Sequence, residues 1–399
     1  MGEERSTPAA APVPPVHPAP PSLGALVRLG LFYGIAGFGG GYSVLAQLRR
    51  DLVEKRAWVS ADDFLAAAEI SKSLPGTAST NLLALLGQRV ARVRGGILAA
   101  SAFLAPSTLL VIACGAAYSV LRSLPWLATF FDGMNAAMVG VVGWVTLDLG
   151  RSALKSKRDV ALAVLCAVLL ATRLVAEPIL AAAAVLVGAA RGGWRARPGG
   201  HGGSGGGASA VSFAAPIVLV GSLGSLAGLV RVFVPIGATT FGGGLAMIPA
   251  IEHTVVLEQG WLDPKAFADA IALGQITPGP VAICATFIGY RVAGVAGALV
   301  ATVAMFAPAM TITLAAGASI ERFRASPIVD GVLRTLAPVV IGMLAAATFS
   351  LGRAAVAVHV DAALAIGAFV VLVARPVSPL WVLVGGGLVR LGVAWLQAR

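Results

Sequence analysis

The sequence contains one uncommon string twice, as Phe38-Gly39-Gly40-Gly41 and as Phe241-Gly242-Gly243-Gly244. The similarity continues on both sides of the string at a nearly constant offset. The matched residues are Leu26-Val27-Arg28 with Leu229-Val230-Arg231, Trp58 with Trp261, Phe64 with Phe267, Pro75-Gly76 with Pro278-Gly279 and, after a one-residue slip, Gly87 with Gly289, Arg89 with Arg291, Pro106 with Pro308 and Gly115 with Gly317. The chain therefore consists of two copies of one unit.

The composition indicates a membrane protein. Of the 399 residues, 58% are hydrophobic and 12% are charged, whereas a soluble domain carries about 25% charged residues. Apolar runs approach the roughly 20 residues that a membrane-spanning helix needs. They are Leu23–Leu45, Gly95–Leu121, Trp126–Leu149, Val160–Leu174 and Ile179–Gly188, then Ala214–Ala246, Gly294–Ile320, Ile328–Leu351, Ala354–Val373 and Leu380–Leu396. Because lipid offers no hydrogen bonds to the backbone, we predict an all-α integral membrane protein.

Several other classes of function are disfavoured. The net charge of +11 comes from Lys and Arg in short loops, which is typical of the positive-inside bias and not of a nucleic-acid partner. The three cysteines and four histidines are scattered, so the sequence predicts neither a metal site nor a disulfide framework. It contains no GxxxxGK[ST] motif for binding nucleotide phosphates. We expect no cofactor and no enzymatic activity.

The chain divides into four segments. Residues 1–22 form a Pro/Ala-rich tail that we expect to be disordered, and residues 191–212 form a Gly-rich cytoplasmic linker. Between and after them lie the first transmembrane repeat, residues 23–190, and the second, residues 213–399. The loop after the first span is basic in copy one, whereas its counterpart in copy two is acidic. Five spans per copy would place equivalent loops on opposite sides, so we predict inverted-topology repeats with the first residue outside the cytoplasm.

A mildly apolar segment separates the first two long runs of each copy. These segments, residues 61–88 and 264–290, are each interrupted by Pro-Gly, which stops a helix. We predict that each is a re-entrant hairpin of two half-helices. Irregular backbone at membrane depth is tolerated only inside the protein or beside a cavity, so the hairpin tips should lie centrally.

The glycine triplets and the hairpin tips are the candidate site. Backbone N–H groups without shielding side chains, placed at a helix N-terminus, bind anions. The predicted substrate-binding residues are Gly39, Gly40, Gly41, Lys72, Pro75, Gly76, Thr77, Gly242, Gly243, Gly244, Gln275, Thr277, Pro278 and Gly279. The alternative for any single glycine is close helix packing. Two triplets and two tips together favour a site.

Charged residues near the tips are candidates for proton coupling. A charge at membrane depth costs at least about 2.5–3.5 kcal/mol and needs a role or a partner. Glu69 and Asp269 are the candidate proton carriers, Lys72 is positioned to attract an anion, and Gln275 is positioned to donate a hydrogen bond. A local ion pair between Glu69 and Lys72 on a solvated helix face is an equally good interpretation.

With these motifs the sequence resembles the chromate ion transporter family, in its long two-domain form. The similarity is carried in copy two by Phe241–Pro249, Trp261-Leu262, Gln275–Pro280 and Phe287–Thr302, and in copy one by Phe38–Leu45, Trp58, Leu74-Pro75-Gly76 and Gly87–Gly96. Copy one departs from the pattern, since Lys72 replaces a glutamine and Thr77 replaces the second proline of the tip.

The resemblance implies a multi-pass inner-membrane carrier that exports chromate, with proton antiport as the expected energy source and sulfate as the isosteric competitor. The residues themselves support a small divalent oxyanion and a lipid environment. A homodimer is compatible with the sequence, because apolar surfaces for lipid and for a partner look alike. Two alternatives of other classes stay open: a membrane-bound reductase, which needs a redox group, and a non-transporting membrane subunit, which predicts that Lys72→Ala and Gly243→Leu leave cells equally resistant.

Overall fold

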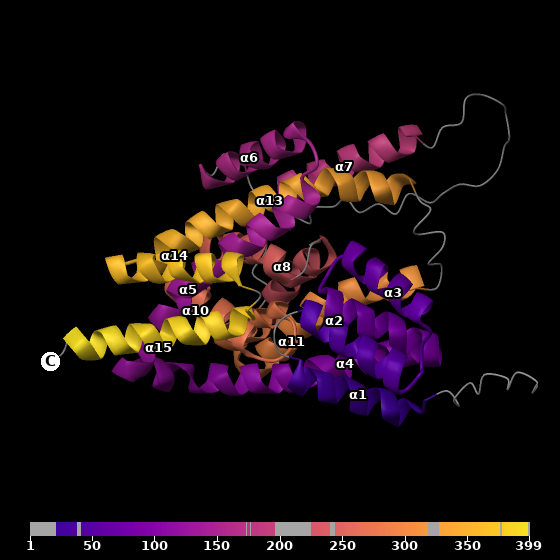
Figure 1. Cartoon of the computed structure of the whole chain (residues 1–399), viewed down its shortest axis with the longest axis horizontal. Coiled ribbons are helices and arrows are strands. Elements are labelled where there is room, and N and C mark those ends of the chain that lie inside the picture. The colour runs from indigo at the N-terminus through magenta and orange to yellow at the C-terminus, as the bar shows by residue number, and fades with distance from the viewer. Residues whose placement is uncertain are drawn as a thin grey trace, which may run out of the picture.

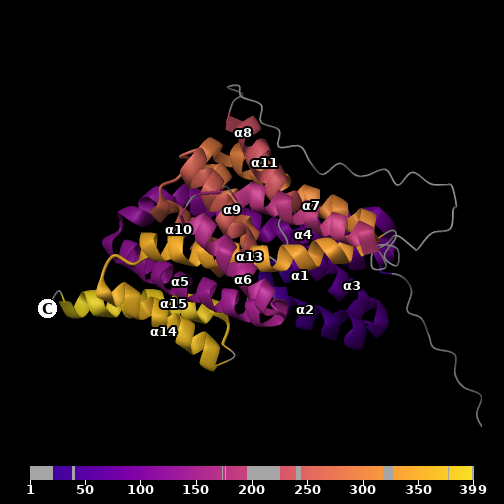
Figure 2. The ribbon, with the colours of Figure 1, turned by 90° about the horizontal axis from the view of Figure 1, so that it is seen from above.

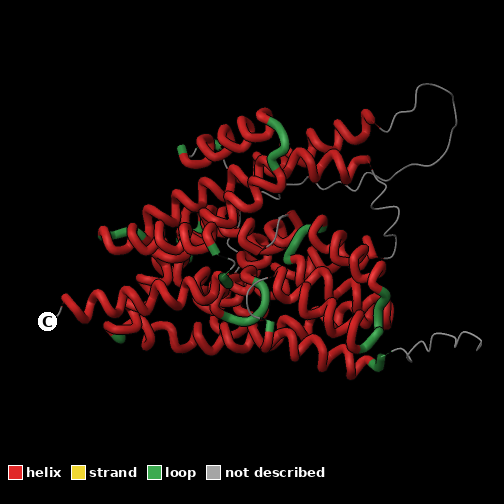
Figure 3. Tube along the Cα trace, in the orientation of Figure 1, coloured by secondary structure: helices red, strands yellow, loops and turns green. Residues whose placement is uncertain are grey.

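The computed structural model describes residues 21–37, 41–172, 174–175, 177–195, 225–239, 244–317, 327–375 and 377–397. Every regular element within these ranges is helical (Figure 3). The predicted tail, apart from residues 21–22, lies outside them, as do residues 196–212 of the predicted linker and the first part of the run Ala214–Ala246. The all-α prediction is confirmed.

The first half contains seven α-helices and a π-helical turn within the described ranges (Figure 1). They are α1 Leu23–Ala36, α2 Gly41–Arg49, η1 Arg50–Lys55, α3 Ala61–Ser73, α4 Ala78–Ser123, α5 Pro125–Ala153, α6 Lys157–Ala171 and α7 Glu177–Arg195. Two boundaries differ from the sequence-based expectation. The first run is broken after Ala36 at the glycine triplet, and α7 continues to Arg195, beyond the expected start of the linker at residue 191.

The second half repeats this order. Its elements are α8 Ser225–Thr239, η2 Gly244–Met247, α9 Ile248–Glu252, η3 His253–Glu258, α10 Pro264–Ile276, η4 Val281–Ile283, α11 Cys284–Gly317, α13 Pro327–Ala355, α14 His359–Ala374 and α15 Pro379–Gln397. Five helical stretches of the described chain are long and apolar enough to cross a membrane: Ala78–Ser123, Pro125–Ala153, Val281–Gly317, Arg334–Ala355 and Pro379–Gln397.

The backbone repeats as closely as the sequence does. The six described residues with positive φ form three pairs at the sequence offset: Ala57 with Gly260, Gly76 with Gly279, and Arg92 with Gly294. The third pair marks tight turns inside α4 and α11, where non-helical backbone at Ala91–Arg92 and Ala293–Gly294 folds each helix back on itself. Each of these long helices is therefore two antiparallel helices, packed through glycines such as Gly87 against Gly95.

The first predicted re-entrant segment is a closed hairpin. Asp63, in the first turn of α3, accepts a hydrogen bond from Arg89 Nη1, which lies near the end of the first limb of α4. Because the two ends of the segment meet, its limbs run antiparallel and the Pro-Gly tip lies at the far end. In the second half, the Tyr118 side chain contacts both limbs, with its hydroxyl on Asp269 of α10 and its ring against Phe287 of α11.

Contacts along α4 and α11 show that equivalent helices of the two halves run in opposite directions. Gln88, near the turn of α4, donates to the carbonyl of Leu314, near the end of α11, with Nε2 to O 2.8 Å. Conversely Gly115, near the end of α4, packs against the ring of Tyr290, near the turn of α11. The start of each long limb thus lies beside the end of the other. This antiparallel arrangement is what inverted repeats require.

The halves also exchange helices. α5 of the first half packs between α14 and α15 of the second, and α13 of the second half packs against α6 and α7 of the first (Figures 1 and 2). Equivalent glycines permit the closest approaches: Gly140 of α5 faces the Ala365 carbonyl, and Gly342 of α13 faces the Ala163 carbonyl. A side chain at either position would meet backbone, so these glycines are needed for helix packing. The two halves consequently form one intertwined body.

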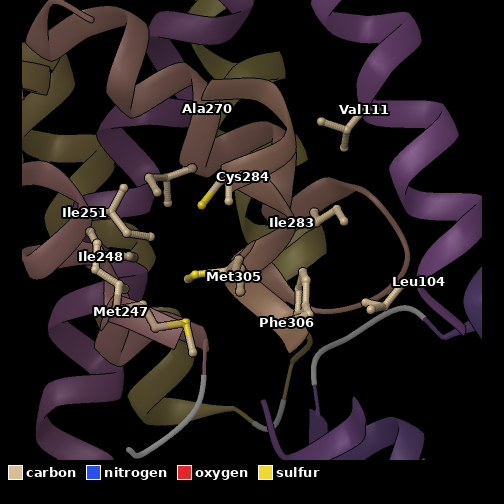
Figure 4. Close-up of a cluster of buried hydrophobic side chains, with 14 of the residues drawn as sticks. Leu104, Val111, Met247, Ile248, Ile251, Ala270, Ile283, Cys284, Met305 and Phe306 are labelled. Atoms are coloured by element: carbon tan, nitrogen blue, oxygen red, sulfur yellow. The ribbon is translucent and has the colours of Figure 1, made fainter. Parts of the chain in front are cut away.

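A large apolar cluster lies beside the helix breaks at the centre of this body. Figure 4 shows Met247, Ile248 and Ile251 facing Cys284 and Met305, with Leu104 and Val111 approaching from α4. The cluster joins η2, α9, α10, η4 and α11 of the second half to α4 of the first. A tightly packed core around the breaks holds the hairpin tips in place.

Candidate functional site

Each hairpin tip is a helix break with a left-handed glycine at its centre. In the first half α3 ends at Ser73 and α4 begins at Ala78, with Gly76 at φ +95°. In the second half α10 ends at Ile276 and η4 begins at Val281, with Gly279 at φ +110°. Only glycine adopts such φ values without strain. The Pro-Gly pairs thus stop one half-helix and start the next, as predicted from the sequence.

The tips pack across the boundary between the halves at equivalent positions. A Cβ atom on Gly76 would lie 2.5 Å from the Cβ of Ala309 in α11, and one on Gly279 would lie 3.0 Å from the Oγ of Ser107 in α4. Ala309 and Ser107 each follow the proline inside their helix, Pro308 and Pro106. Both tips therefore contact the crossing of α4 and α11 from opposite halves, as a pseudo-twofold arrangement requires.

The glycine triplets border the second tip where they are described. The amide of Gly279 donates to the carbonyl of Gly37, just before the first triplet, with N to O 3.3 Å. Gly244, the last residue of the second triplet, packs against Val281 and the amide of Ala282. Gly41 is the first residue of α2. The remaining triplet residues in the predicted site, Gly39, Gly40, Gly242 and Gly243, lie outside the described residues.

Both half-helices that start at the tips lack a side-chain cap. Thr77 precedes α4 and Pro280 precedes η4, and neither side chain accepts from the following turn. The first backbone N–H groups of a helix have no intrahelical partner, and they carry the positive end of the helix dipole. A helix start without a cap therefore leaves backbone donors for an anion.

The two helix starts differ in their side chains. The N-cap residue and first turn of α4 contain buried polar side chains, those of Thr77, Ser79, Thr80 and Asn81. The aligned positions of the second half are Pro280, Ala282, Ile283 and Cys284. Thr77 Oγ1 donates to Thr80 Oγ1 at 2.8 Å, so the hydroxyl hydrogen of Thr80 is left for another acceptor. The sequence-based prediction did not include Ser79, Thr80 or Asn81 in the site. The run of hydroxyls after Pro-Gly was the available signal.

Two other polar side chains at the tips donate to backbone carbonyls, and a third is buried without a partner among the described residues. Asn81 Nδ2 donates to the carbonyl of Pro75 at 2.8 Å, which bridges the break. Thr277 Oγ1 donates to the carbonyl of Gly274 at 3.2 Å. Pro75 and Pro278 are buried with the tips. Gln275 Nε2 is buried and has no hydrogen-bond partner among the described residues. It is therefore a donor whose burial calls for a partner.

The two charged candidates of the first hairpin lie on the exposed face of its first limb. Glu69 and Lys72 are exposed on α3, whereas Ser71 between them is fully buried. Residues three apart share a helix face, so both charges lie on the exposed face of this limb. The alternative interpretation, charged residues on a helix surface, fits this position.

Asp269 is the most buried charged candidate, and its partners come from the first half. Its side chain has no exposed surface, and it accepts from Tyr118 Oη at 2.5 Å, Arg122 Nε at 2.8 Å, Arg122 Nη2 at 3.1 Å and Asn135 Nδ2 at 2.7 Å. The sequence marked Asp269 but gave no indication of these donors, because they lie more than 130 positions away along the chain. Across the described residues, no group of His, Cys, Asp or Glu is arranged to hold a metal ion.

Two intertwined halves, paired helix breaks and long apolar helices define the class: a multi-pass helical membrane protein built from two repeated halves. Comparison with known protein families identifies it further. The family described as "Chromate transporter" matches residues 25–190 and 227–391, once for each half. The chain belongs to this family.

Individual relatives agree with the family match. The chain is 32% identical to the chromate transport protein of Cupriavidus metallidurans, with 85% of each chain covered. It is 33% identical to the probable chromate transport protein of Synechococcus elongatus, over 85% of this chain and 86% of that protein. The chromate transport protein of Pseudomonas aeruginosa is 27% identical over 84% of this chain and 82% of its own length. No solved structure matches the chain.

Proposed function

We propose that this protein is a secondary carrier that moves a small divalent oxyanion, chromate, out of the cytoplasm by alternating access. The observation that carries the proposal is the pair of buried, uncapped helix starts, contributed by opposite halves and packed on the crossing of α4 and α11. Converging half-helix termini near the centre of an inverted repeat are the usual substrate site of such carriers. The relatives named as chromate transport proteins support the choice of oxyanion.

In this proposal the start of α4 is the main binding surface. The N–H groups after Thr77 and the hydroxyls of Ser79 and Thr80 supply neutral donors in a buried environment. Hydrogen bonds to an ionised acceptor are about twice as strong as neutral ones. Neutral donors suit a carrier, because they hold a dianion without the permanent ion pair that would slow its release.

The second tip completes the site from the other half. Gly279 supplies backbone that no side chain covers, and Thr277 supplies a hydroxyl. Gln275 supplies a buried side-chain amide nitrogen that needs an acceptor. The proposed site also includes the other triplet and tip residues that the sequence predicts. Lys72 attracts the anion by its charge. Sulfate has the same charge and tetrahedral shape, so donor geometry alone would admit it as a competitor.

Proton coupling is the energy source in this proposal. Of the two carboxylate candidates, Glu69 lies on the exposed face of α3, whereas Asp269 is fully buried. All four contacts to Asp269 donate hydrogens to its carboxylate, so a proton there would displace a donor. Glu69 is therefore the better candidate.

The deciding experiment measures chromate and sulfate flux in proteoliposomes, with and without a pH gradient. The proposal predicts chromate flux that the gradient accelerates and that sulfate inhibits. Absence of flux for both ions refutes it. Chromate flux that does not depend on the pH gradient is consistent with a carrier and refutes proton coupling alone. A flavin or haem absorbance spectrum from the purified protein would favour the membrane-bound reductase instead.

A further inference from the structure

The network around Asp269 joins the two halves at the open end of the second hairpin. Asp269 belongs to α10, whereas Tyr118 and Arg122 belong to the last turns of α4, and Asn135 belongs to α5. All four hydrogen bonds to this carboxylate thus come from the first half. Any motion that separates the second hairpin from α4 and α5 must break them together.

The Tyr118 ring also packs against the second hairpin, on the limb opposite Asp269. It lies edge-to-face against Phe287, with centroids 5.0 Å apart, and the guanidinium of Arg291 lies 5.3 Å from its centroid. Tyr118 is 7% exposed, and it contacts both limbs of the hairpin, at Asp269 and at Phe287. A buried aromatic side chain whose hydroxyl is hydrogen-bonded to the Asp269 carboxylate excludes water from that carboxylate.

Arg122 has a second carboxylate partner nearer the surface. Its Nη1 lies 3.0 Å from Asp132 Oδ1, and Lys265 Nζ also lies 3.0 Å from that oxygen. The Asp132 side chain is 33% exposed, whereas Asp269 is fully buried. If the hairpin moves away, Arg122 can stay paired with Asp132, which reduces the penalty of breaking a buried ion pair.

We propose that Tyr118, Arg122 and Asn135 form a gate with Asp269. The network is intact when the mouth at the second hairpin is closed, and it opens when that hairpin separates from α4. The proposal rests on the proposed alternating-access function. It assigns Asp269 a gating role and leaves the coupling proton to another group.

Thiol labelling of Ala272→Cys tests the gate. Ala272 is fully buried, and it lies one turn deeper along α10 than Asp269 on the same face. The reporter is placed in the full chain with Cys114, Cys166 and Cys284 replaced by alanine. A membrane-impermeant thiol reagent is then applied to vesicles from either side, without substrate.

Asp269→Asn should accelerate labelling about tenfold or more from one side only, since loss of one partner of a buried ion pair shifts a two-state equilibrium by at least that factor. Asp361→Asn is the matched control. Asp361 is also buried and lies 2.8 Å from Arg390 Nε, but both residues belong to the second half. It should not change the labelling rate.

Combining Asp269→Asn with Arg122→Gln should label no faster than Asp269→Asn alone, because both changes break one contact. Unchanged labelling in Asp269→Asn, or equal acceleration in Asp361→Asn, overturns the gate. The outcome is separable from the proposed function. Absence of chromate flux in the unmodified protein refutes the carrier function but leaves the labelling result standing. Normal chromate flux together with unchanged labelling in Asp269→Asn refutes the gate alone.

Discussion

Replacing Gly76 by alanine probes the first tip with the least chemical change. Gly76 has φ +95°, and a Cβ there would lie 2.5 Å from the Cβ of Ala309 in the other half. Holding a non-glycine residue in such a conformation costs about 1–3 kcal/mol. Overpacking a tight contact costs about 1–3 kcal/mol more. We therefore expect Gly76→Ala to destabilise the native tip by about 2–6 kcal/mol, since the two terms act together.

The expected result is a lower melting temperature and a raised chromate KM, because the strained tip lowers stability and displaces the backbone donors that follow it. Both are measured on purified protein, by thermal unfolding in detergent and by flux into proteoliposomes. Adding Ala309→Gly removes the steric contact and leaves the φ strain, so the double variant should recover roughly half of the loss.

Gly367→Ala is the matched control, because Gly367 lies in α14 and a Cβ there would meet no described atom within 4 Å. It should leave the melting temperature and the flux unchanged or slightly improved. A Gly76→Ala protein with the stability and KM of the parent would refute the packing of the first tip. Failure of Ala309→Gly to restore any function would refute its contact with the other half.

Three further sets of variants separate the site from its supports. Ser79→Ala and Thr80→Ala should each raise the chromate KM about tenfold in flux assays, since a hydrogen bond to a charged group contributes about 1.5–3 kcal/mol. KM values equal to that of the parent protein would contradict binding at α4. Gly342→Leu should abolish the monodisperse peak in size-exclusion chromatography, because its Cβ would lie 2.5 Å from a backbone oxygen of α6, and a normal peak would contradict the exchange of helices. Asp63→Asn should lower stability by less than about 1 kcal/mol with flux retained, because its pair with Arg89 is partly exposed; a large loss in thermal unfolding would show that this pair is essential to the hairpin.

The repeat and the helix breaks could be predicted from the sequence because glycine and proline act locally. A positive φ or a missing N–H is a property of one residue, so Pro75-Gly76 and Pro278-Gly279 mark the same break in both halves. The long apolar runs were equally predictable. Their ends were less so, as with α1, which ends at Ala36 before the triplet.

The exchange of helices between halves was beyond sequence reasoning. A helix face against lipid and a helix face against α13 are both apolar, so composition does not reveal that α6 and α7 pack on the other half. The same limit applies to Asp269. The sequence indicates that a buried carboxylate needs hydrogen-bond donors. Only the fold determines that Tyr118, Arg122 and Asn135 donate to it.

The most direct test of the central claim is to locate the bound oxyanion. A crystal of the protein soaked in chromate gives an anomalous signal from chromium at one position. We expect the peak beside the first turn of α4, between Thr77 and the crossing of α4 with α11, so that the chromate oxygens lie within hydrogen-bond distance of that turn. A peak on the exposed face of α3, out of reach of the first turn of α4, would contradict this proposal.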